Sequence, residues 1–303
     1  MDWRVSLRVY AALLFAMLVW GLSFLAVKDA VGTMPVFSLL FGRFVIATVV
    51  LGLLAARGKR WRLPKRDVLT LAGLSLLSPI GYFLFETHGV SLTQASHASI
   101  LIAFIPVAVY LAAFFRRQEL ATWRKTAGIL LAVGGVLAIV VSASSEQGAS
   151  LIGDLLVLGA VLCAAARTTL IKDALRRVSP LQLTFYQFFF SLVVFGPLAG
   201  TVGFSWIERM SPLLWGELLF LGVFCSAGAF LAMHYALSHI TATRVAVSAN
   251  LVPLITLLAE VLLFGVLLTP VKLVGALLTI LGVALTQWAP SRMEPAPVPP
   301  RGG

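Results

Sequence analysis

The chain has 303 residues, of which 60% are hydrophobic and only 12% are charged. Soluble domains carry about 25% charged residues, and a mean hydropathy of +0.99 leaves too few polar side chains to cover a fold in water. The composition therefore excludes a soluble globular protein and predicts a chain that folds in a lipid bilayer.

Apolar runs of about 20 residues recur along the whole chain. A run of that length crosses the hydrocarbon core, about 30 Å thick, as a helix, because each backbone amide in lipid needs an internal partner. We therefore expect an all-α polytopic membrane protein with ten transmembrane helices. The expected spans are residues 9–28, 37–56, 68–88, 96–115, 126–143, 151–170, 181–203, 213–237, 243–267 and 270–288.

The net charge of +11 could indicate a nucleic-acid partner, but the placement of the basic residues argues against it. They gather in the loops after the second, fourth and sixth spans, at residues 57–66, 116–125 and 172–177. The third and fifth loops contain none. This asymmetry follows the positive-inside rule and predicts both termini in the cytoplasm of a multi-pass inner (plasma) membrane protein. The expected partner of the basic loops is the anionic lipid surface, with no nucleic acid.

The two halves of the chain resemble each other when one is shifted along the sequence onto the other. The number of residues in this shift, the offset, differs slightly between two sets of aligned segments. ASHASILIAFIP (95–106) aligns with ATRVAVSANLVP (242–253) at the larger offset, and AVKDA (26–30) aligns with LIKDA (170–174) at the smaller one. Because each half holds five spans, an odd number, the second half must enter the membrane from the opposite side. Inverted repeats of this kind are a recurrent build of secondary transporters, in which the two halves exchange conformations around a central site.

The repeat divides the chain into three parts. We expect a first five-helix repeat at residues 1–143 and a second, inverted one at residues 151–288. Residues 289–303 are rich in proline and lack apolar periodicity, so we expect a disordered cytoplasmic tail.

Three motifs carry a resemblance to a known family. They are VWGLSF (19–24), GRFVIA (42–47) and the run GVSLTQASHASILIAFIPV (89–107), closed by Glu119. In this order and spacing the chain resembles the EamA-type members of the drug/metabolite transporter superfamily over about residues 9–288. The resemblance implies transport of a small metabolite, frequently export of an amino acid, across a bacterial inner membrane. Ala164 and Ala165 stand where Trp20 and Gly21 would repeat, so the substrate's identity does not carry over.

Arg43 and Glu86 are charged residues of the first repeat that are expected to lie in the outer half of the membrane. Arg43 lies about 10 Å below the outer surface by helical rise, and Glu86 ends the third span on the same side. A charge inside a bilayer is costly and calls for a partner. We expect the two to form or share a charge network at the mouth of a substrate cavity. The alternative is that Glu86 reaches headgroup water and Arg43 binds helix-end carbonyls.

Other residues are expected to line the same cavity. Trp20 and Phe24 lie four apart on one face in mid-span, where tryptophan is less common than at the interface. The remaining candidates are Tyr82, His88, His234, Asn250 and Glu260. Arg167, near the inner end of the sixth span, is expected to snorkel to the lipid surface.

Two carboxyl groups and two prolines suggest how such a cavity would work. Glu86 and Glu260 are candidates for proton coupling, because a carboxyl in a desolvated wall can exchange protons near neutral pH. The alternative is a hydrogen-bonded structural carboxyl between helices. Pro106 and Pro253 occupy matching positions and are candidate hinges, since proline frees a backbone carbonyl one turn earlier.

Glycines on the fifth and tenth spans suggest close helix contacts. Gly128 and Gly135 are one heptad apart, as are Gly275 and Gly282. Faces of small residues let membrane helices approach closely. We expect these helices to serve as scaffold or as the contact of a homodimer.

Enzyme signatures are absent from the sequence. There is no His-Glu-x-x-His motif, no pair of aspartates inside spans, and no nucleotide-binding loop of the GxxxxGK[ST] type. We expect no catalytic residue, no cofactor and no metal. The function predicted is therefore secondary transport of a small molecule by alternating access. The first alternative is a flippase of a lipid-linked small molecule, which could use the same scaffold with a lateral opening. A membrane-embedded enzyme is the less favoured alternative.

Overall fold

The computed structural model describes residues 3–56, 63–115, 122–142, 149–240, 245, 248–249, 251–265 and 269–288. Within these ranges the chain forms helices and no strand. The first half contains α1 (Trp3–Ala30), α2 (Val36–Ala56), α3 (Lys65–Ser75), η1 (Leu76–Gly81), α4 (Tyr82–Leu92), α5 (Ala95–Ile102), α6 (Ile105–Phe115) and α7 (Trp123–Ser142). The second half contains α8 (Leu151–Leu175), α9 (Pro180–Thr201), η2 (Ser205–Arg209), α10 (Pro212–Leu219), η3 (Phe220–Gly228), α11 (Ala229–His239), α13 (Leu251–Phe264) and α14 (Pro270–Trp288).

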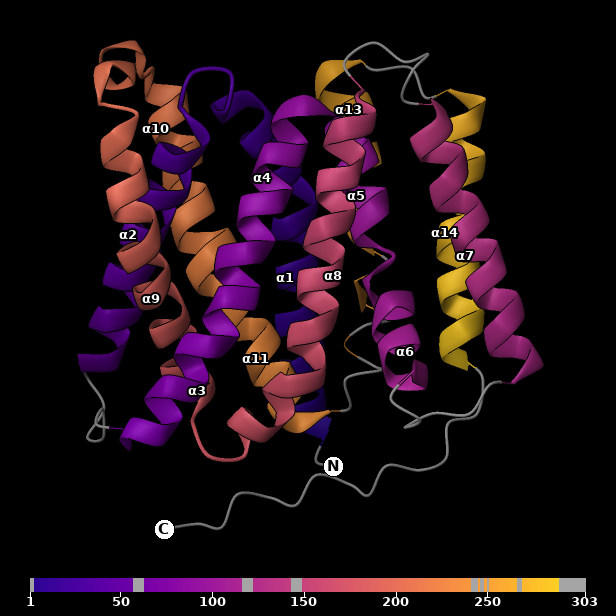
Figure 1. Ribbon diagram of the computed structural model, residues 1–303, viewed down its shortest axis with the longest axis horizontal. Helices are drawn as coiled ribbons and strands as arrows, with labels where there is room; N and C mark the ends of the chain where they lie inside the picture. The colour runs from indigo at the N-terminus through magenta and orange to yellow at the C-terminus, as the bar shows by residue number, and fades with distance from the viewer. Residues whose placement is uncertain are drawn as a thin grey trace.

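The helices form one upright bundle, in which α1 begins and α14 ends at the same, lower edge (Figure 1). Among the described residues, seven helical segments are long and apolar enough to cross a membrane, and helices at 251–263 and 270–285 are apolar but shorter. Large apolar side chains such as Leu53 and Leu162 lie exposed on the outside of the bundle. The expected all-helical, multi-pass membrane protein is confirmed.

Several helix boundaries recur at the offsets seen in the sequence. The helices α4 and α11 have the same length, and their first residues, Tyr82 and Ala229, are related by the larger offset. Immediately before them lie irregular turns, η1 and η3, which end at Gly81 and Gly228, again related by the larger offset. The helices α2 and α9 begin at positions related by the smaller offset. Each half thus carries a π-helical stretch at the same place in its third membrane segment, and in η1 the non-helical residue Ser78 interrupts it.

Four phenylalanine rings meet at the centre of the bundle, and we call them the central aromatic cluster: Phe44, Phe83, Phe188 and Phe230. Phe44 and Phe188 are counterparts at the smaller offset, and their ring centroids lie 5.2 Å apart. Phe83 and Phe230 are counterparts at the larger offset, with centroids 5.8 Å apart. Phe44 contacts Phe83 at 5.3 Å, and Phe188 contacts Phe230 at the same distance. Each ring therefore contacts its own counterpart in the other half, in geometries that aromatic pairs favour.

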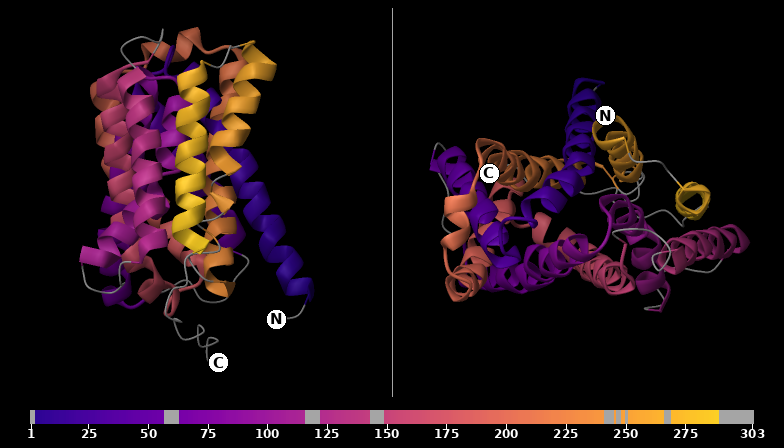
Figure 2. Two further views of the ribbon diagram at one scale, coloured as in Figure 1. Left: turned by 90° about the vertical axis from the view of Figure 1, so that its right-hand side faces the viewer. Right: turned by 90° about the horizontal axis from the view of Figure 1, so that it is seen from above.

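The helices α7 and α14 form a pair at one edge of the bundle (Figures 1 and 2). A Cβ atom added at Gly135 would lie 2.6 Å from the carbonyl oxygen of Gly275, and one at Gly282 would lie 2.5 Å from that of Gly128. The glycine faces that were expected to serve as scaffold or dimer contact thus pack against each other within one chain. A homodimer through the remaining surface of these helices stays a prediction.

The candidate hinge prolines stand at helix beginnings rather than in the middle of a helix. Pro106 is the second residue of α6, which follows a break in the helix at residues 103–104, and Pro253 is the third residue of α13. Proline is tolerated in a first turn because the N–H groups there have no partner inside the helix. The kink expected from proline is therefore a helix start, and the hinge role stays a prediction.

Candidate functional site

Arg43 is held at the centre of the bundle by the irregular segment of the other half. Its side chain, which extends from α2, is 1% exposed. Its Nε donates a hydrogen bond to Ser226 Oγ at 3.0 Å, and its guanidinium lies over the Phe83 ring, 4.4 Å from the centroid. Ser226 belongs to η3 and donates in turn to the Leu221 carbonyl. The sequence placed Arg43 inside the membrane but could not name this partner.

A second contact of the same kind joins the two halves, with the side chain coming from the second half and its partner from the first. Gln187 stands on α9 as the counterpart of Arg43 at the smaller offset, and its Nε2 donates to the Ser78 carbonyl at 2.9 Å. Ser78 lies in η1, where its φ of −157° and ψ of 127° interrupt the helix and free that carbonyl. Each half therefore sends a polar side chain from its second helix to the π-helical stretch of the other half, Arg43 to η3 and Gln187 to η1.

Glu86 lies near Arg43 without bonding to it directly. It is 3% exposed, and its Oε2 accepts a hydrogen bond from Thr87 Oγ1 at 2.8 Å. The charges of Arg43 and Glu86 act on each other, and Tyr82 lies within reach of both. We call Arg43, Ser226, Glu86 and Thr87 the Arg43 cluster. The structure thus buries both residues in one region of the bundle, and the charge network between them stays a prediction.

Trp20 connects α1 to the same irregular segment. Its indole N–H donates to the Cys225 carbonyl at 3.1 Å, and its ring meets Phe230 edge-on at 5.3 Å. Phe24, one turn further along α1, is 3% exposed and packs in the apolar core. Trp20 therefore lies beside the central aromatic cluster, whereas Phe24 contributes to core packing.

Arg167, His234 and Thr184 form a second buried polar group, which we call the Arg167 cluster. Arg167 donates to His234 Nε2. A guanidinium can only donate, so Nε2 accepts, and the proton of the ring lies on Nδ1. Nδ1 then donates to Thr184 Oγ1 at 2.8 Å, and Thr184 donates to the Pro180 carbonyl at 2.6 Å. Three helices, α8, α9 and α11, meet in this chain of hydrogen bonds.

The expectation that Arg167 snorkels is wrong. Its exposed fraction is only 5%, and its guanidinium lies inside the bundle, 6.0 Å from the centroid of the Phe230 ring. A partner on another helix, His234, outweighs the pull of the lipid surface. Single-sequence reasoning missed this because the contact joins residues 67 positions apart.

The central aromatic cluster separates the two polar clusters. Glu86 follows Phe83 by about one turn on α4, which runs toward the upper end in Figure 1. His234 follows Phe230 by about one turn on α11, which runs toward the lower end. The Arg43 cluster therefore lies above the aromatic rings and the Arg167 cluster below them.

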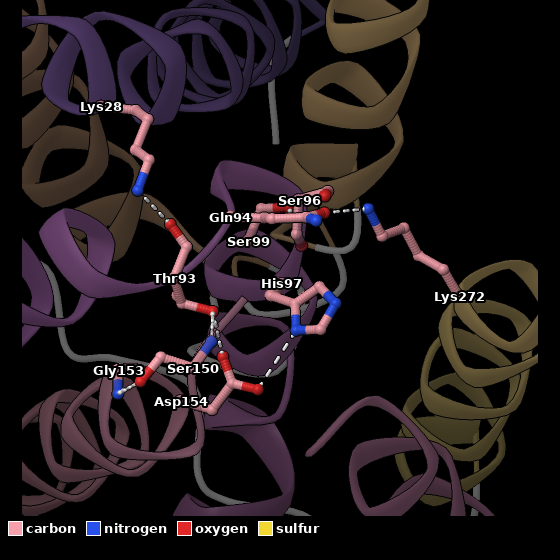
Figure 3. Close-up of polar contacts among 10 residues, drawn as sticks. All are labelled: Lys28, Thr93, Gln94, Ser96, His97, Ser99, Ser150, Gly153, Asp154 and Lys272. Atoms are coloured by element: carbon pink, nitrogen blue, oxygen red, sulfur yellow. Dashed lines mark hydrogen bonds and ion pairs between the residues drawn. The ribbon is translucent and has the colours of Figure 1, made fainter. Parts of the chain in front are cut away.

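A further set of polar contacts surrounds the link between α4 and α5 at residues 90–97, and we call it the upper-end network (Figure 3). Lys28 Nζ donates to the carbonyls of Val90, Ser91 and Thr93, at 3.0, 3.2 and 2.6 Å. Thr93 Oγ1 donates to Asp154 at 2.6 Å, and the other carboxylate oxygen of Asp154 lies 3.1 Å from His97 Nδ1. The partners of Asp154, Thr93 and His97, lie far from it in the sequence, so no local pattern points to this contact.

Glu260 belongs to the upper-end network. From α13 its Oε1 accepts a hydrogen bond from the backbone N–H of Ser96, at 2.9 Å, in the first turn of α5. A carboxylate is favourable there because the first N–H groups of a helix lack partners and carry partial positive charge. Nearby, Lys272 donates to Gln94 Oε1 (Figure 3). This arrangement matches the structural alternative for Glu260, and the coupling role stays a prediction.

The remaining candidates lie apart from the Arg43 cluster. His88 Nδ1 lies 2.8 Å from the Leu84 carbonyl of its own helix, and its ring packs edge-on against Phe37. His234 belongs to the Arg167 cluster, and Asn250 lies outside the described residues. The structure thus gathers Arg43, Glu86 and Tyr82 and places Trp20 beside them, whereas it places His88 and Glu260 toward the upper end and His234 toward the lower end.

A groove of about 460 Å³ lies between the start of α9 and α11. Its lining is mainly apolar and consists of Ser179, Pro180, Leu181, Gly228, Leu231, Ala232 and Tyr235. The Arg43 cluster contributes nothing to it. The groove is suited to an apolar chain rather than to a small polar solute.

Comparison with known proteins gives a consistent result over nearly the whole chain. The model of the EamA-like transporter family matches twice, at residues 7–141 and 151–288. The uncharacterized transporter YcxC of Bacillus subtilis is 29% identical, with 90% of each chain covered. An uncharacterized transporter of Archaeoglobus fulgidus is 30% identical, covering 92% of this chain and 97% of its own.

Two further matches concern a named activity and the fold. A protein of Streptantibioticus cattleyicolor, named a probable terminal-alkyne amino-acid exporter, is 27% identical over 93% of this chain and 94% of its own. A crystal structure that covers 91% of this chain and 95% of its own superimposes with a TM-score of 0.66 at 19% identity, which indicates a shared fold. The chain belongs to the EamA-like transporter family and is a membrane transporter.

Proposed function

We propose that this protein is a secondary transporter that exports a small metabolite, such as an amino acid or related amphiphile, by alternating access. The observation that carries the proposal is the layered centre of the bundle. A buried polar cluster lies on each side of the central aromatic cluster, and paired rings from the two halves form the barrier between them. A substrate held at either cluster would face only one end of the bundle.

The reciprocal contacts support an inverted repeat of five membrane helices per half, at residues 1–143 and 151–288. Under a twofold relation between antiparallel halves, the contact of Gly135 with Gly275 must recur as the contact of Gly282 with Gly128, and it does. Gly52 likewise faces Phe185, and Gly196 faces Phe41. We propose ten spans in all. Residues 289–303, the proposed cytoplasmic tail, lie outside the described residues.

We propose that the lower end of the bundle faces the cytoplasm and that the protein lies in the inner membrane. The helix ends that adjoin the basic loops, namely the start of α3, the start of α7 and the end of α8, lie on the side where α1 begins and α14 ends, as the positive-inside rule requires of a cytoplasmic face. The Arg167 cluster would then be the cytoplasmic site and the Arg43 cluster the outer one. The upper-end network would hold the outer side closed.

Glu86 is the carboxyl group best placed for coupling transport to protons. It lies buried next to Arg43, above the aromatic barrier, whereas Glu260 caps α5 in the upper-end network. A carboxyl can take up and release a proton, while the neighbouring guanidinium keeps its charge. We propose Glu86 first and Glu260 second as the coupling site.

The test is counterflow and efflux of amino acids and related amphiphiles from proteoliposomes, with and without a pH gradient. We expect at least one zwitterionic or anionic amphiphile to be transported and the pH gradient to accelerate its efflux. Glu86→Gln should abolish the acceleration, whereas Glu208→Gln, at an exposed position, should leave it unchanged. Glu260→Gln tests the second coupling candidate in the same assay.

Two outcomes would count against these proposals separately. Acceleration that survives in both Glu86→Gln and Glu260→Gln would remove the coupling proposal alone. Absence of transport for the whole panel, in liposomes that contain folded protein, would contradict the assignment as a metabolite exporter.

The apolar groove between α9 and α11 favours one alternative, a flippase of a lipid-linked small molecule. Such a protein would hold the lipid chain in the groove while the head group crosses the bundle. Loss of asymmetry of a fluorescent lipid in the same proteoliposomes, without counterflow of soluble metabolites, would favour the flippase.

A further inference from the structure

Arg167 carries a buried charge that the described part of the chain does not balance. Only 5% of the residue is exposed, and a guanidinium stays protonated in proteins. Its hydrogen-bond partner, His234, accepts the bond as a neutral ring, and its Nε has no partner. Among the side chains that the structure describes, no carboxylate forms an ion pair with Arg167. Arg43, by contrast, has Glu86 nearby.

A buried charge without a counter-charge is costly, so the site favours an anion that arrives from outside the chain. We propose that Arg167 is the anion-binding residue of the transporter's lower site and that it takes a single carboxylate of the substrate. His234 positions the guanidinium by accepting one of its N–H groups. The free Nε–H and the remaining N–H groups then face the ligand, and such a fork matches the two oxygens of a carboxylate.

The surroundings of Arg167 narrow the class of anion. The only other ionisable group in the Arg167 cluster is His234, which accepts from the guanidinium and so adds no positive charge. One guanidinium balances a monoanion, whereas a doubly charged phosphate would leave negative charge buried. The Phe230 ring, 6.0 Å from the guanidinium, places an aromatic side chain beside the site. The substrate class is therefore a small carboxylate with an apolar or aromatic body, which includes amino acids with such side chains.

This inference rests on the proposed transport function, but direct binding tests it separately. Purified protein in phosphatidylcholine nanodiscs is titrated calorimetrically with two matched pairs of probes: 3-phenylpropanoate and 3-phenylpropanamide, and hexanoate and hexanamide. We expect wild type to bind at least one carboxylate about tenfold or more tightly than its amide, the range that a charge-assisted hydrogen bond confers. Arg167→Gln should remove the preference. Arg177→Gln, a half-exposed arginine near the same end, should keep it.

The role of His234 has its own readout. His234→Gln retains an acceptor for the guanidinium and should keep most of the carboxylate preference, whereas His234→Leu should lose it. A purely structural role would lower thermal stability in both variants without separating their preferences. This pair also keeps the proposal testable if Arg167→Gln does not fold.

Several results would overturn the inference. The first is that wild type binds carboxylate and amide equally tightly in both pairs. The second is that folded Arg167→Gln still binds the carboxylate more tightly than the amide. The third is that the two His234 variants prefer the carboxylate to the same degree. Abolition of probe binding when phosphatidylglycerol is added would mean that a lipid head group occupies Arg167 instead. If the protein transports only uncharged metabolites, this inference is wrong but the assignment as a transporter holds. If it binds carboxylates but transports nothing, the proposed function is wrong.

Discussion

Glu86→Gln is expected to lower the free energy of unfolding by about 1–3 kcal/mol, the cost of leaving a buried polar group without its partner. The substitution keeps the size of the side chain but leaves Arg43, which is 1% exposed, without a counter-charge. Arg43→Gln should cost less, because a lone buried carboxyl can take up a proton whereas a lone guanidinium cannot lose one. The double variant should be more stable than Glu86→Gln alone.

The measurement is reversible unfolding of all three variants by sodium dodecyl sulfate in mixed micelles, read as a double-mutant cycle. Glu208→Gln and Arg209→Gln, adjacent exposed residues of η2, form the matched control cycle and should show coupling near zero. If the losses at Arg43 and Glu86 simply add, the two residues do not share a charge network. The alternative interpretation, in which each is satisfied separately, would then hold.

Gly135→Ala is expected to destabilise the protein by at least about 1–3 kcal/mol, the usual cost of overpacking. The added methyl group would lie 2.6 Å from both the Gly275 carbonyl oxygen and the Thr279 backbone nitrogen, and neither atom can move without shifting α14. Gly282→Ala should act similarly, since its Cβ would lie 2.4 Å from the Ala132 backbone nitrogen. In membranes, close packing of this kind replaces much of the hydrophobic drive for helix association.

The adjacent Gly134 provides the control. A Cβ there meets nothing within 4 Å, so Gly134→Ala changes helix propensity and little else. Thermal unfolding of the three variants in detergent should show a lowered midpoint for Gly135→Ala and Gly282→Ala and an unchanged or raised one for Gly134→Ala. Equal midpoints for Gly134→Ala and Gly135→Ala would mean that α7 and α14 do not pack face to face in the membrane.

The membrane class and the helical nature of the spans could be predicted from the sequence, because they follow from run length and the loss of water. The places where a span breaks could not. Ser78 interrupts a helix that reads as one continuous apolar run, and its freed carbonyl is satisfied by Gln187, 109 residues away. Propensity and periodicity describe local structure, whereas these breaks depend on a partner from the other half.

The candidate site could be predicted only in part, for a similar reason. Arg43 and Glu86 stood out because charges are rare in apolar spans. Arg167 was misread because a basic residue near the cytoplasmic side usually has water within reach, and only the fold reveals His234 beside it. The central aromatic cluster follows from the repeat pattern of the sequence. Phe44 and Phe83 recur as Phe188 and Phe230 at the offsets of the repeat, and each ring contacts its counterpart.

The most direct test of the layered centre is labelling of single cysteines by a membrane-impermeant thiol reagent in sealed vesicles of known orientation. Thr87→Cys and Thr184→Cys, introduced after replacement of Cys163 and Cys225 by serine, report on the polar clusters above and below the central aromatic cluster. We predict labelling of the first only from outside and of the second only from the cytoplasmic side, with substrate changing the two rates in opposite directions. Labelling of both positions from one side, or at rates that rise together, would contradict alternating access across the aromatic barrier.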